Sequence, residues 1–225
     1  MKKRFFVTGT DTDAGKTFVT VGLLKAAKRA GIKSFGLKPI AAGAERIDGV
    51  LRHNDGLLIQ QASSVSLPYE QVNPVVFETR MAPHISAMKE NKLITASRLE
   101  GYIKGALLIP HEFVLIEGAG GWRLPLNDRE FLSDVAKCIE FPVILVVNMK
   151  LGCLNHAILT AEAIARDGLV LSGWVANTGP EKMPNYDENI ASLSAMIPAP
   201  LLGALSWTQD EKVSESQFDK LFLAL

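Results

Sequence analysis

A glycine-rich turn between a short apolar strand and an amphipathic helix constrains this chain more than any other feature. The stretch Gly9-Thr-Asp-Thr-Asp-Ala-Gly-Lys-Thr17 follows the apolar run Phe5–Thr8 and opens a helical pattern. Backbone N–H groups of such a turn converge on an anion, and the helix dipole adds partial positive charge there. Lys16 can reach terminal phosphates, and the Thr17 hydroxyl can hold Mg²⁺. The turn predicts a phosphate-binding loop, although five residues separate its two glycines instead of the usual four.

Composition excludes some classes of protein. The 24 Lys and Arg balance the 24 Asp and Glu, so no basic field favours nucleic acid. The longest purely apolar stretch, Phe141–Val147, is far shorter than the ~20 residues of a membrane span. Cys138 and Cys153 match no metal-ligand spacing and suggest reduced thiols. We expect a soluble cytoplasmic protein that folds as one α/β domain over residues 1–225, with neither a membrane nor a nucleic acid as partner.

Apolar runs alternate with helical patterns along the chain. We expect strands at 4–8, 34–37, 113–116, 143–147, 170–176 and 201–205, and helices at 16–30, 55–63, 96–108, 131–139, 155–167 and from about 214. Residues 64–92, with three prolines, are expected to be irregular. This alternation predicts a mainly parallel, doubly wound sheet with helices on both faces, as in phosphate-loop nucleoside triphosphate hydrolases.

Polar residues follow the expected strands, where ligands of parallel sheets bind. Glu117 ends an apolar strand, as the acidic residue of the second nucleotide-binding motif does, and Asp55 precedes a helix. With Thr17 they form a candidate magnesium set, because Mg²⁺ prefers oxygen ligands. Lys38 precedes Pro39, which favours an extended backbone that aims the lysine toward the phosphates. The alternatives are a solvated carboxylate for Glu117, a helix cap for Asp55 and a surface lysine for Lys38.

Two further strand ends carry candidate ligand groups. Asn155, in the segment Lys150–His156, has the character of a helix N-cap, beside which free N–H groups attract anions. Asn177 has the amide donor and acceptor needed to contact an adenine edge. The alternative for the segment Lys150–His156 is an ordinary capped helix that binds no ligand, and the alternative for Asn177 is an asparagine in a turn. His84 and His156 are interpreted as loop or cap residues with no catalytic role.

The chain resembles the dethiobiotin synthetase family over nearly its whole length and in order. The matching motifs are Gly9–Thr17, Lys38-Pro39, Leu51-Arg-His-Asn-Asp55, Val72-Asn-Pro74, Ala82-Pro-His84, Glu117-Gly-Ala-Gly-Gly-Trp122, Pro142–Val147, Lys150-Leu-Gly-Cys-Leu-Asn-His156, Gly173-Trp-Val-Ala-Asn177 and Ile197–Gly203. The five-residue spacing in the phosphate loop is typical of this family.

The resemblance implies an ATP-dependent ligase that closes a cyclic urea from 7,8-diaminononanoate and CO₂ or bicarbonate. It further implies Mg²⁺, ATP as co-substrate, and a homodimer in which the partner's helix start binds the substrate carboxylate. The expected catalytic residues are Lys38, Lys16 and Thr12. The expected nucleotide-binding residues are Asp13, Ala14, Gly15, Lys16, Thr17, Phe18, Asp55, Glu117, Gly118, Ala119, Gly120, Asn177, Ser206 and Trp207. The expected substrate-binding residues are Thr12, Lys38, Ala42, Lys150, Leu151, Gly152, Cys153 and Asn155, and the expected metal ligands are Thr17, Asp55 and Glu117.

The sequence departs from the family pattern at a few places. Ala42 stands where the pattern has a small hydroxyl residue near the carbamate, Thr178 replaces an acidic residue, and Ser206-Trp207-Thr208 replaces a Pro-Trp-Leu-like stretch. Three alternatives stay open: a partitioning-type ATPase, a related ligase that forms amides or ureas, and a regulatory nucleotide-binding subunit. Thr10 argues against the first, because partitioning ATPases carry a signature lysine there.

Overall fold

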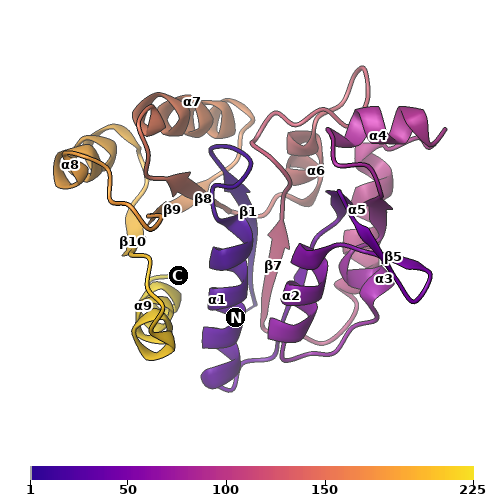
Figure 1. The fold of residues 1–225 in the computed structure, drawn as a ribbon, viewed down its shortest axis with the longest axis horizontal. Helices are drawn as coiled ribbons and strands as arrows, with labels where there is room; N and C mark the ends of the chain where they lie inside the picture. Colours follow the sequence, from indigo (N-terminus) through magenta and orange to yellow (C-terminus); the bar gives the residue numbers. More distant parts are fainter. Residues whose placement is uncertain (1) are drawn as a thin grey trace.

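A parallel sheet of six strands forms the centre of the computed structural model, which describes residues 2–225 (Figure 1). Its strands follow the order β10-β9-β8-β1-β7-β2, and every neighbouring pair is parallel. Their bounds are β1 Lys3–Gly9, β2 Ser34–Leu37, β7 Phe113–Glu117, β8 Val143–Asn148, β9 Leu171–Asn177 and β10 Leu201–Leu205. From β1 the chain first builds the sheet on one side and then on the other, so the loop after β1 lies where the strand order reverses.

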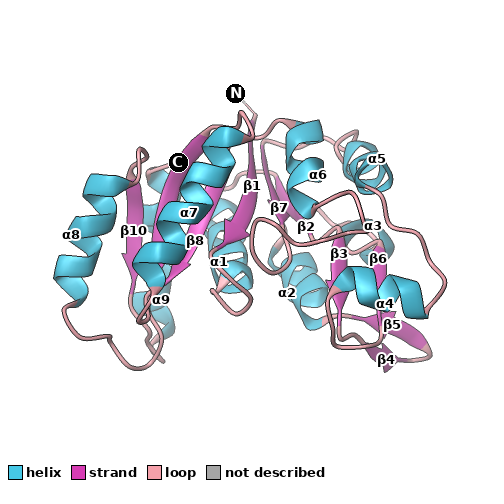
Figure 2. Cartoon of the chain, turned by 90° about the horizontal axis from the view of Figure 1, so that it is seen from above, coloured by secondary structure: helices cyan, strands magenta, loops and turns pink. Residues whose placement is uncertain are grey.

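Helices cover both faces of this sheet (Figure 2). One face carries α1 (Lys16–Arg29), α2 (Asn54–Ala62) and α9 (Glu211–Leu223). The other face carries α5 (Ala96–Ala106), α6 (Leu132–Ile139) and α7 (Cys153–Arg166), and α8 (Tyr186–Met196) packs beside α7. The expected doubly wound α/β fold is therefore confirmed.

Burial on both faces explains the composition of the central strands. Every residue of β7 is buried, and β8 is buried from Val143 to Val147. Strands that are covered twice consist of continuous apolar runs instead of alternating ones, which is why the sequence located them well. Glu117 is the exception, a carboxylate with no exposed surface at the end of an apolar strand.

A smaller lobe fills the connection between β2 and α5, near the carboxyl ends of the strands. It contains a parallel pair, β3 (Ile40–Ala42) with β6 (Val75–Phe77), and a hairpin of β4 (Glu45–Ile47) and β5 (Val50–Arg52). The short helices α3 (Tyr69–Val72) and α4 (Pro83–Lys89) complete the lobe. Only the hairpin has a strong local signal, the Asp48-Gly49 turn, in which both residues have positive φ.

The expectation that residues 64–92 are irregular was wrong, because this stretch contains α3, β6 and α4. Its prolines occupy positions that tolerate a missing N–H. Pro68 is the N-cap of α3, Pro74 precedes β6, and Pro83 is the first residue of α4. The prediction treated these prolines as residues that interrupt secondary structure, whereas each of them stands at the start of a helix or strand.

The structure corrects two further helix predictions. Helix α8 was not predicted, because Leu193 alone among its residues is fully buried and its apolar pattern is weak. Helix α7 begins at Cys153, and its N-cap is Gly152 with φ of 90°, so the prediction of Asn155 as N-cap was wrong. Glycine serves there because the backbone needs a left-handed conformation. None of the helices within residues 2–225 is both long and apolar enough to cross a membrane.

Two helical glycines give a matched test of this packing. A Cβ at Gly22 in α1 would collide with the buried ring of Phe218 in α9, whereas a Cβ at Gly105 in α5 would meet nothing within 4 Å. We expect Gly22→Ala to lower the free energy of unfolding by about 1–3 kcal/mol through overpacking. Gly105→Ala should raise it by up to ~1 kcal/mol through helix propensity. Urea denaturation of both variants measures the difference, and equal effects would contradict the α1–α9 packing.

Candidate active site

The turn between β1 and α1 closes tightly against the end of β9. Gly15 is the N-cap of α1 with φ of 93°, and a Cβ there would collide with the Asn177 side-chain amide. Asn177 Nδ2 donates a hydrogen bond of 3.0 Å to the Ala14 carbonyl. Glycine is thus required for both conformation and space. The first N–H groups of α1 have no side-chain cap, so the helix start is free to bind an anion.

Lys16 crosses this turn and is nearly buried. Its Nζ donates to the Asp11 carbonyl at 2.9 Å and to the Gly120 carbonyl, in the loop after β7, at 2.7 Å. Burial and then the neighbouring Lys38 charge lower the pKa of Lys16 to about 8. The ammonium is therefore held where the turn opens, and a phosphate bound there would raise the pKa of Lys16 by stabilising its charged form.

A buried ion-pair cluster lies beside the turn. Lys38 Nζ is 2.6 Å from Glu117 Oε1 and 3.0 Å from Asp55 Oδ2, and it donates to the Gly118 carbonyl at 3.0 Å. Lys38 is only 4% exposed and Glu117 is fully buried. The alternatives of a surface lysine and a solvated strand-end carboxylate are excluded by this burial. Asp55 does not cap α2, because His53 is the N-cap and its ring accepts from the Asp55 N–H.

Charge pairing dominates the titration of this cluster. Burial alone would lower the pKa of Lys38, but the Glu117 and Asp55 carboxylates outweigh it and raise that pKa. Burial likewise opposes ionisation of Asp55, yet the Lys38 charge lowers the pKa of this carboxyl. Both groups therefore stay charged, and removing Lys38 would leave the buried Glu117 carboxylate without its cation.

Residues that the sequence interpretation did not assign hold the Lys38 backbone. Asn73 Nδ2 donates to the Lys38 carbonyl at 2.6 Å, and the Tyr69 hydroxyl bonds Asn73 Oδ1 at 2.9 Å. The His53 N–H in turn donates to the Tyr69 hydroxyl at 2.7 Å. The motif Val72-Asn73-Pro74 was the one sequence feature that could have pointed to Asn73, but nothing in it indicates a contact with Lys38.

The three expected metal ligands lie together. The Thr17 hydroxyl donates to Glu117 Oε1 at 2.7 Å, and Lys38 bridges Glu117 and Asp55. Within residues 2–225 no group of three or more His, Cys, Asp or Glu side chains could hold a metal. Glu117 Oε2, however, is buried and has no hydrogen-bond partner. An unpartnered carboxylate oxygen beside a threonine hydroxyl fits Mg²⁺, which takes few protein ligands together with phosphate oxygens and water.

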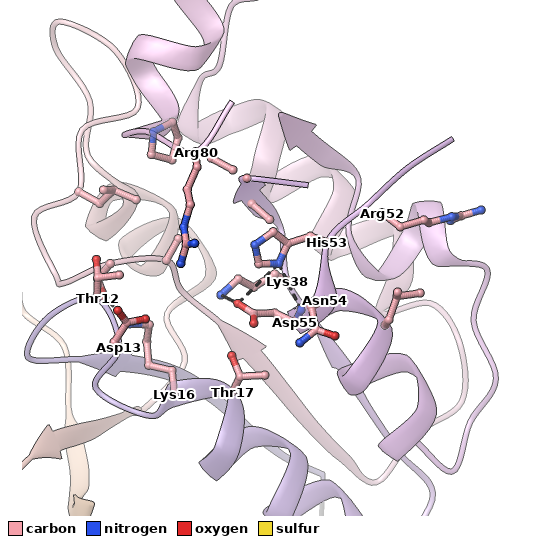
Figure 3. Close-up of a pocket in the computed structure, with 18 of the residues that line it drawn as sticks. Thr12, Asp13, Lys16, Thr17, Lys38, Arg52, His53, Asn54, Asp55 and Arg80 are labelled. Carbon is pink, nitrogen blue, oxygen red and sulfur yellow. Dashed lines mark hydrogen bonds and ion pairs between the residues drawn. The ribbon is translucent and has the colours of Figure 1, made fainter. Parts of the chain in front are cut away.

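Lys16, Thr17, Lys38 and Asp55 line one cavity of roughly 1060 Å³ between the phosphate loop and the smaller lobe, whereas the fully buried Glu117 is not part of its wall (Figure 3). The expected site residues on its wall are Thr12, Asp13, Gly15, Lys16, Thr17, Phe18, Lys38, Ala42, Asp55, Ala119 and Gly120. The unassigned residues include Arg52, His53 and Arg80. The structure thus brings together the residues expected to bind phosphate, metal and the reacting part of the substrate.

Ala14, Glu117 and Gly118 do not line this cavity, and two further groups of expected residues lie outside it. Lys150, Leu151, Gly152, Cys153 and Asn155 surround the start of α7, where Leu151 is 94% exposed and Cys153 is buried. Asn177 contacts the back of the phosphate loop instead of lining the cavity, while Ser206 and the half-exposed Trp207 follow β10. Ser206 is tied to α9 by the Gln217 side chain, which accepts from its N–H at 2.8 Å. The expected adenine and carboxylate roles of these residues stay predictions.

Comparison with known proteins agrees with this geometry. A family model described as AAA domain matches residues 3–213. The ATP-dependent dethiobiotin synthetase BioD of Cellvibrio japonicus is 53% identical over 204 residues, covering 91% of this chain and 89% of that protein. BioD 1 of Escherichia coli O157:H7 is 44% identical over 225 residues and both full lengths. The septum site-determining protein MinD with Mg-ADP from Pyrococcus horikoshii has a TM-score of 0.63 at 17% identity, covering 99% of this chain and 95% of that one.

The doubly wound parallel sheet and the glycine-rich turn between β1 and α1 define the phosphate-loop class of fold. The two curated relatives, which are 44% and 53% identical over at least 91% of this chain, show the family within this class. The chain belongs to the AAA-domain family and, within it, to the ATP-dependent dethiobiotin synthetases, which are ligases. The expected enzyme class is confirmed.

The lowered pKa of Lys16 predicts a pH dependence of nucleotide binding. The protonated ammonium attracts phosphate, so affinity should be highest below the pKa and should decline as the pH rises through about 8. Calorimetric titration with a non-hydrolysable ATP analogue across this range measures the effect. An affinity that is unchanged from neutral pH to well above the Lys16 pKa would contradict the assignment.

Proposed function

We propose that this enzyme closes a cyclic urea on 7,8-diaminononanoate with CO₂ and Mg-ATP. One substrate amine attacks CO₂ and loses a proton, which gives a carbamate. A carbamate oxygen attacks the γ-phosphorus, and the bond to ADP breaks. The second amine then attacks the carbonyl carbon of this mixed anhydride, phosphate leaves, and the amine loses a proton. The products are dethiobiotin, ADP and phosphate.

The observation that carries this proposal is the pair of buried ammonium groups, Lys16 and Lys38, which face one cavity beside the phosphate loop. The reaction must bring an anionic carbamate against an anionic γ-phosphate. Two unit charges ~4 Å apart repel by about 1 kcal/mol in water and about 4 kcal/mol at an effective dielectric of ~20. Cations fixed by the fold offset this repulsion without reorganising during the reaction.

Each residue has a distinct part in this proposal. The free N–H groups at the start of α1 and Lys16 hold the phosphates, and Lys38 lies toward the carbamate oxygen and the transferring phosphoryl group. Thr12 faces the space between them (Figure 3). Thr17, Asp55 and Glu117 would hold Mg²⁺, which when bound supplies positive charge to the phosphate oxygens.

The substrate's carboxylate tail requires a second site. No side chain caps the start of α7, although the Cys153 N–H donates to the Lys150 carbonyl at 2.9 Å, and this helix start lies outside the cavity of its own chain. We therefore propose a homodimer in which the partner's α7 start, from Lys150 to Asn155, receives the carboxylate. Replacing that carboxylate by an amide should raise the KM for the substrate, and an unchanged KM would remove this site.

Phosphate release tests the reaction itself. We expect ADP and phosphate to form only when ATP, Mg²⁺, diaminononanoate and bicarbonate are all present, with dethiobiotin in equal amount by mass spectrometry. ATP hydrolysis at the same rate with and without the diamine would favour a switch-type ATPase. Nucleotide binding without any turnover would favour a regulatory subunit.

Lys38→Ala should separate chemistry from binding. Because Lys38 lies toward the reacting oxygens and not in the loop, we expect kcat to fall by about 10²-fold or more while ATP affinity changes little. Thermal unfolding checks that the variant folds, since it leaves Glu117 and Asp55 without their cation. Lys25→Ala, at an exposed position of α1, is the control and should change neither quantity. Equal losses of affinity and turnover in Lys38→Ala would contradict the role.

A further inference from the structure

Arg80 is a positive charge on the cavity wall that the proposed reaction has not yet used. It belongs to the segment between β6 and α4, in the smaller lobe. Figure 3 shows its side chain reaching from the wall opposite the phosphate loop into the space that Thr12 and Lys38 also face. No local sequence pattern marks this arginine, because it lies in the stretch that was expected to be irregular.

Hydrogen bonds hold the segment that precedes Arg80. The N–H groups of Gly43 and Ala44 both donate to the Phe77 carbonyl at 3.0 Å, which joins the ends of β3 and β6. A Cβ built on Gly43 would lie 3.0 Å from Arg80 Cγ, so the arginine stem lies directly against the Gly43 backbone. Thr79 is tied to the buried Ser86 of α4 by a hydroxyl pair at 3.1 Å. The stem therefore lies along Gly43, while the residue as a whole is exposed to solvent.

The guanidinium has no partner within residues 2–225: no carboxylate there pairs with it, and no carbonyl accepts its hydrogen bonds. The adjacent acid, Glu78, pairs instead with Arg46 at 3.2 Å. Asp55 on the cavity wall and the buried Glu117 both pair with Lys38. Arg80 thus presents five free donors to a cavity whose ligands are anions.

We propose that Arg80 binds the carbamate formed on the substrate amine, an inference that rests on the proposed reaction. A carbamate is planar with two oxygens, like a carboxylate, and the guanidinium fork matches that shape with two parallel hydrogen bonds. Ala42 and Gly43, which line the wall beside Arg80, carry no side-chain donor, and His53 is the lobe residue with imidazole nitrogens on this wall. Arg80 would hold the carbamate from the side of the smaller lobe, and Lys38 would face it from the side of the sheet. Together the two cations would direct the reacting carbamate oxygen toward the phosphate loop.

The test compares the wild-type enzyme with Arg80→Gln, Arg80→Lys and the control Arg52→Gln. Arg52 also lines the cavity, but its guanidinium points away in Figure 3, stacks 4.1 Å from the Tyr69 ring centre and pairs with Glu70 at 3.0 Å. Diaminononanoate affinity is measured by calorimetry with a non-hydrolysable ATP analogue, with and without bicarbonate. Steady-state KM and kcat are measured beside it.

We expect bicarbonate to tighten diamine binding in the wild-type enzyme and in Arg52→Gln. Arg80→Gln should lose roughly tenfold or more of that tightening, as for loss of a charge-assisted pair, with ATP KM unchanged. Arg80→Lys should recover only part of it, because a lysine keeps the charge without the fork.

Other outcomes overturn the inference. Equal weakening by Arg80→Gln with and without bicarbonate would assign Arg80 to the carboxylate tail, and a raised ATP KM would assign it to the phosphates. Unchanged coupling in Arg80→Gln beside active wild-type enzyme would refute the role of Arg80 and leave the reaction intact. A wild-type enzyme that forms no dethiobiotin, or shows no bicarbonate coupling, would refute the carbamate and Arg80's role with it.

Discussion

The Lys38 ammonium, enclosed by the carboxylates of Glu117 and Asp55, is the interaction on which the site depends. Each charge is costly to bury alone, and together they compensate one another. The cluster also joins the end of β2, the start of α2 and the end of β7, three segments far apart in the sequence. A buried ion pair is weak evidence for stability, so its value here lies in fixing a cation at a defined place beside the phosphate loop.

The parallel sheet makes this arrangement attainable. Carboxyl ends of parallel strands meet at one edge, so the loops after β1 and β7 face each other and Lys16 reaches the Gly120 carbonyl across them. The smaller lobe then closes the opposite side of the cavity and brings Arg80 and His53 to it. One half of the cavity therefore consists of sheet ends, to which the proposed function assigns the phosphates, and the other half of an irregular lobe, to which it assigns the acceptor. This division suits a reaction that needs two anions held in register.

Local signals explain which parts of the fold could be predicted. Continuous apolar runs such as Phe113–Ile116 identify twice-covered strands, and a glycine-rich turn after a strand identifies the phosphate loop. Helix α8 and the start of α7 were missed because their evidence is tertiary: α8 shows little apolar periodicity, and the left-handed Gly152 displaced the expected cap at Asn155. Pro68 and Pro83 were interpreted as breakers, although each begins a helix.

The amino-acid sequence alone determined the doubly wound sheet, the phosphate loop and the identity of Lys16, Lys38 and Glu117 as candidate site residues. Each of these follows from a local pattern: a period of apolar residues, a glycine spacing, or a polar residue at a strand end. Only the tertiary structure decided that Lys38 is buried between two carboxylates, that Asn73 holds its backbone, and that Arg80 enters the cavity. Those facts depend on contacts between segments separated by tens of residues, and no local pattern encodes the distance between two side chains.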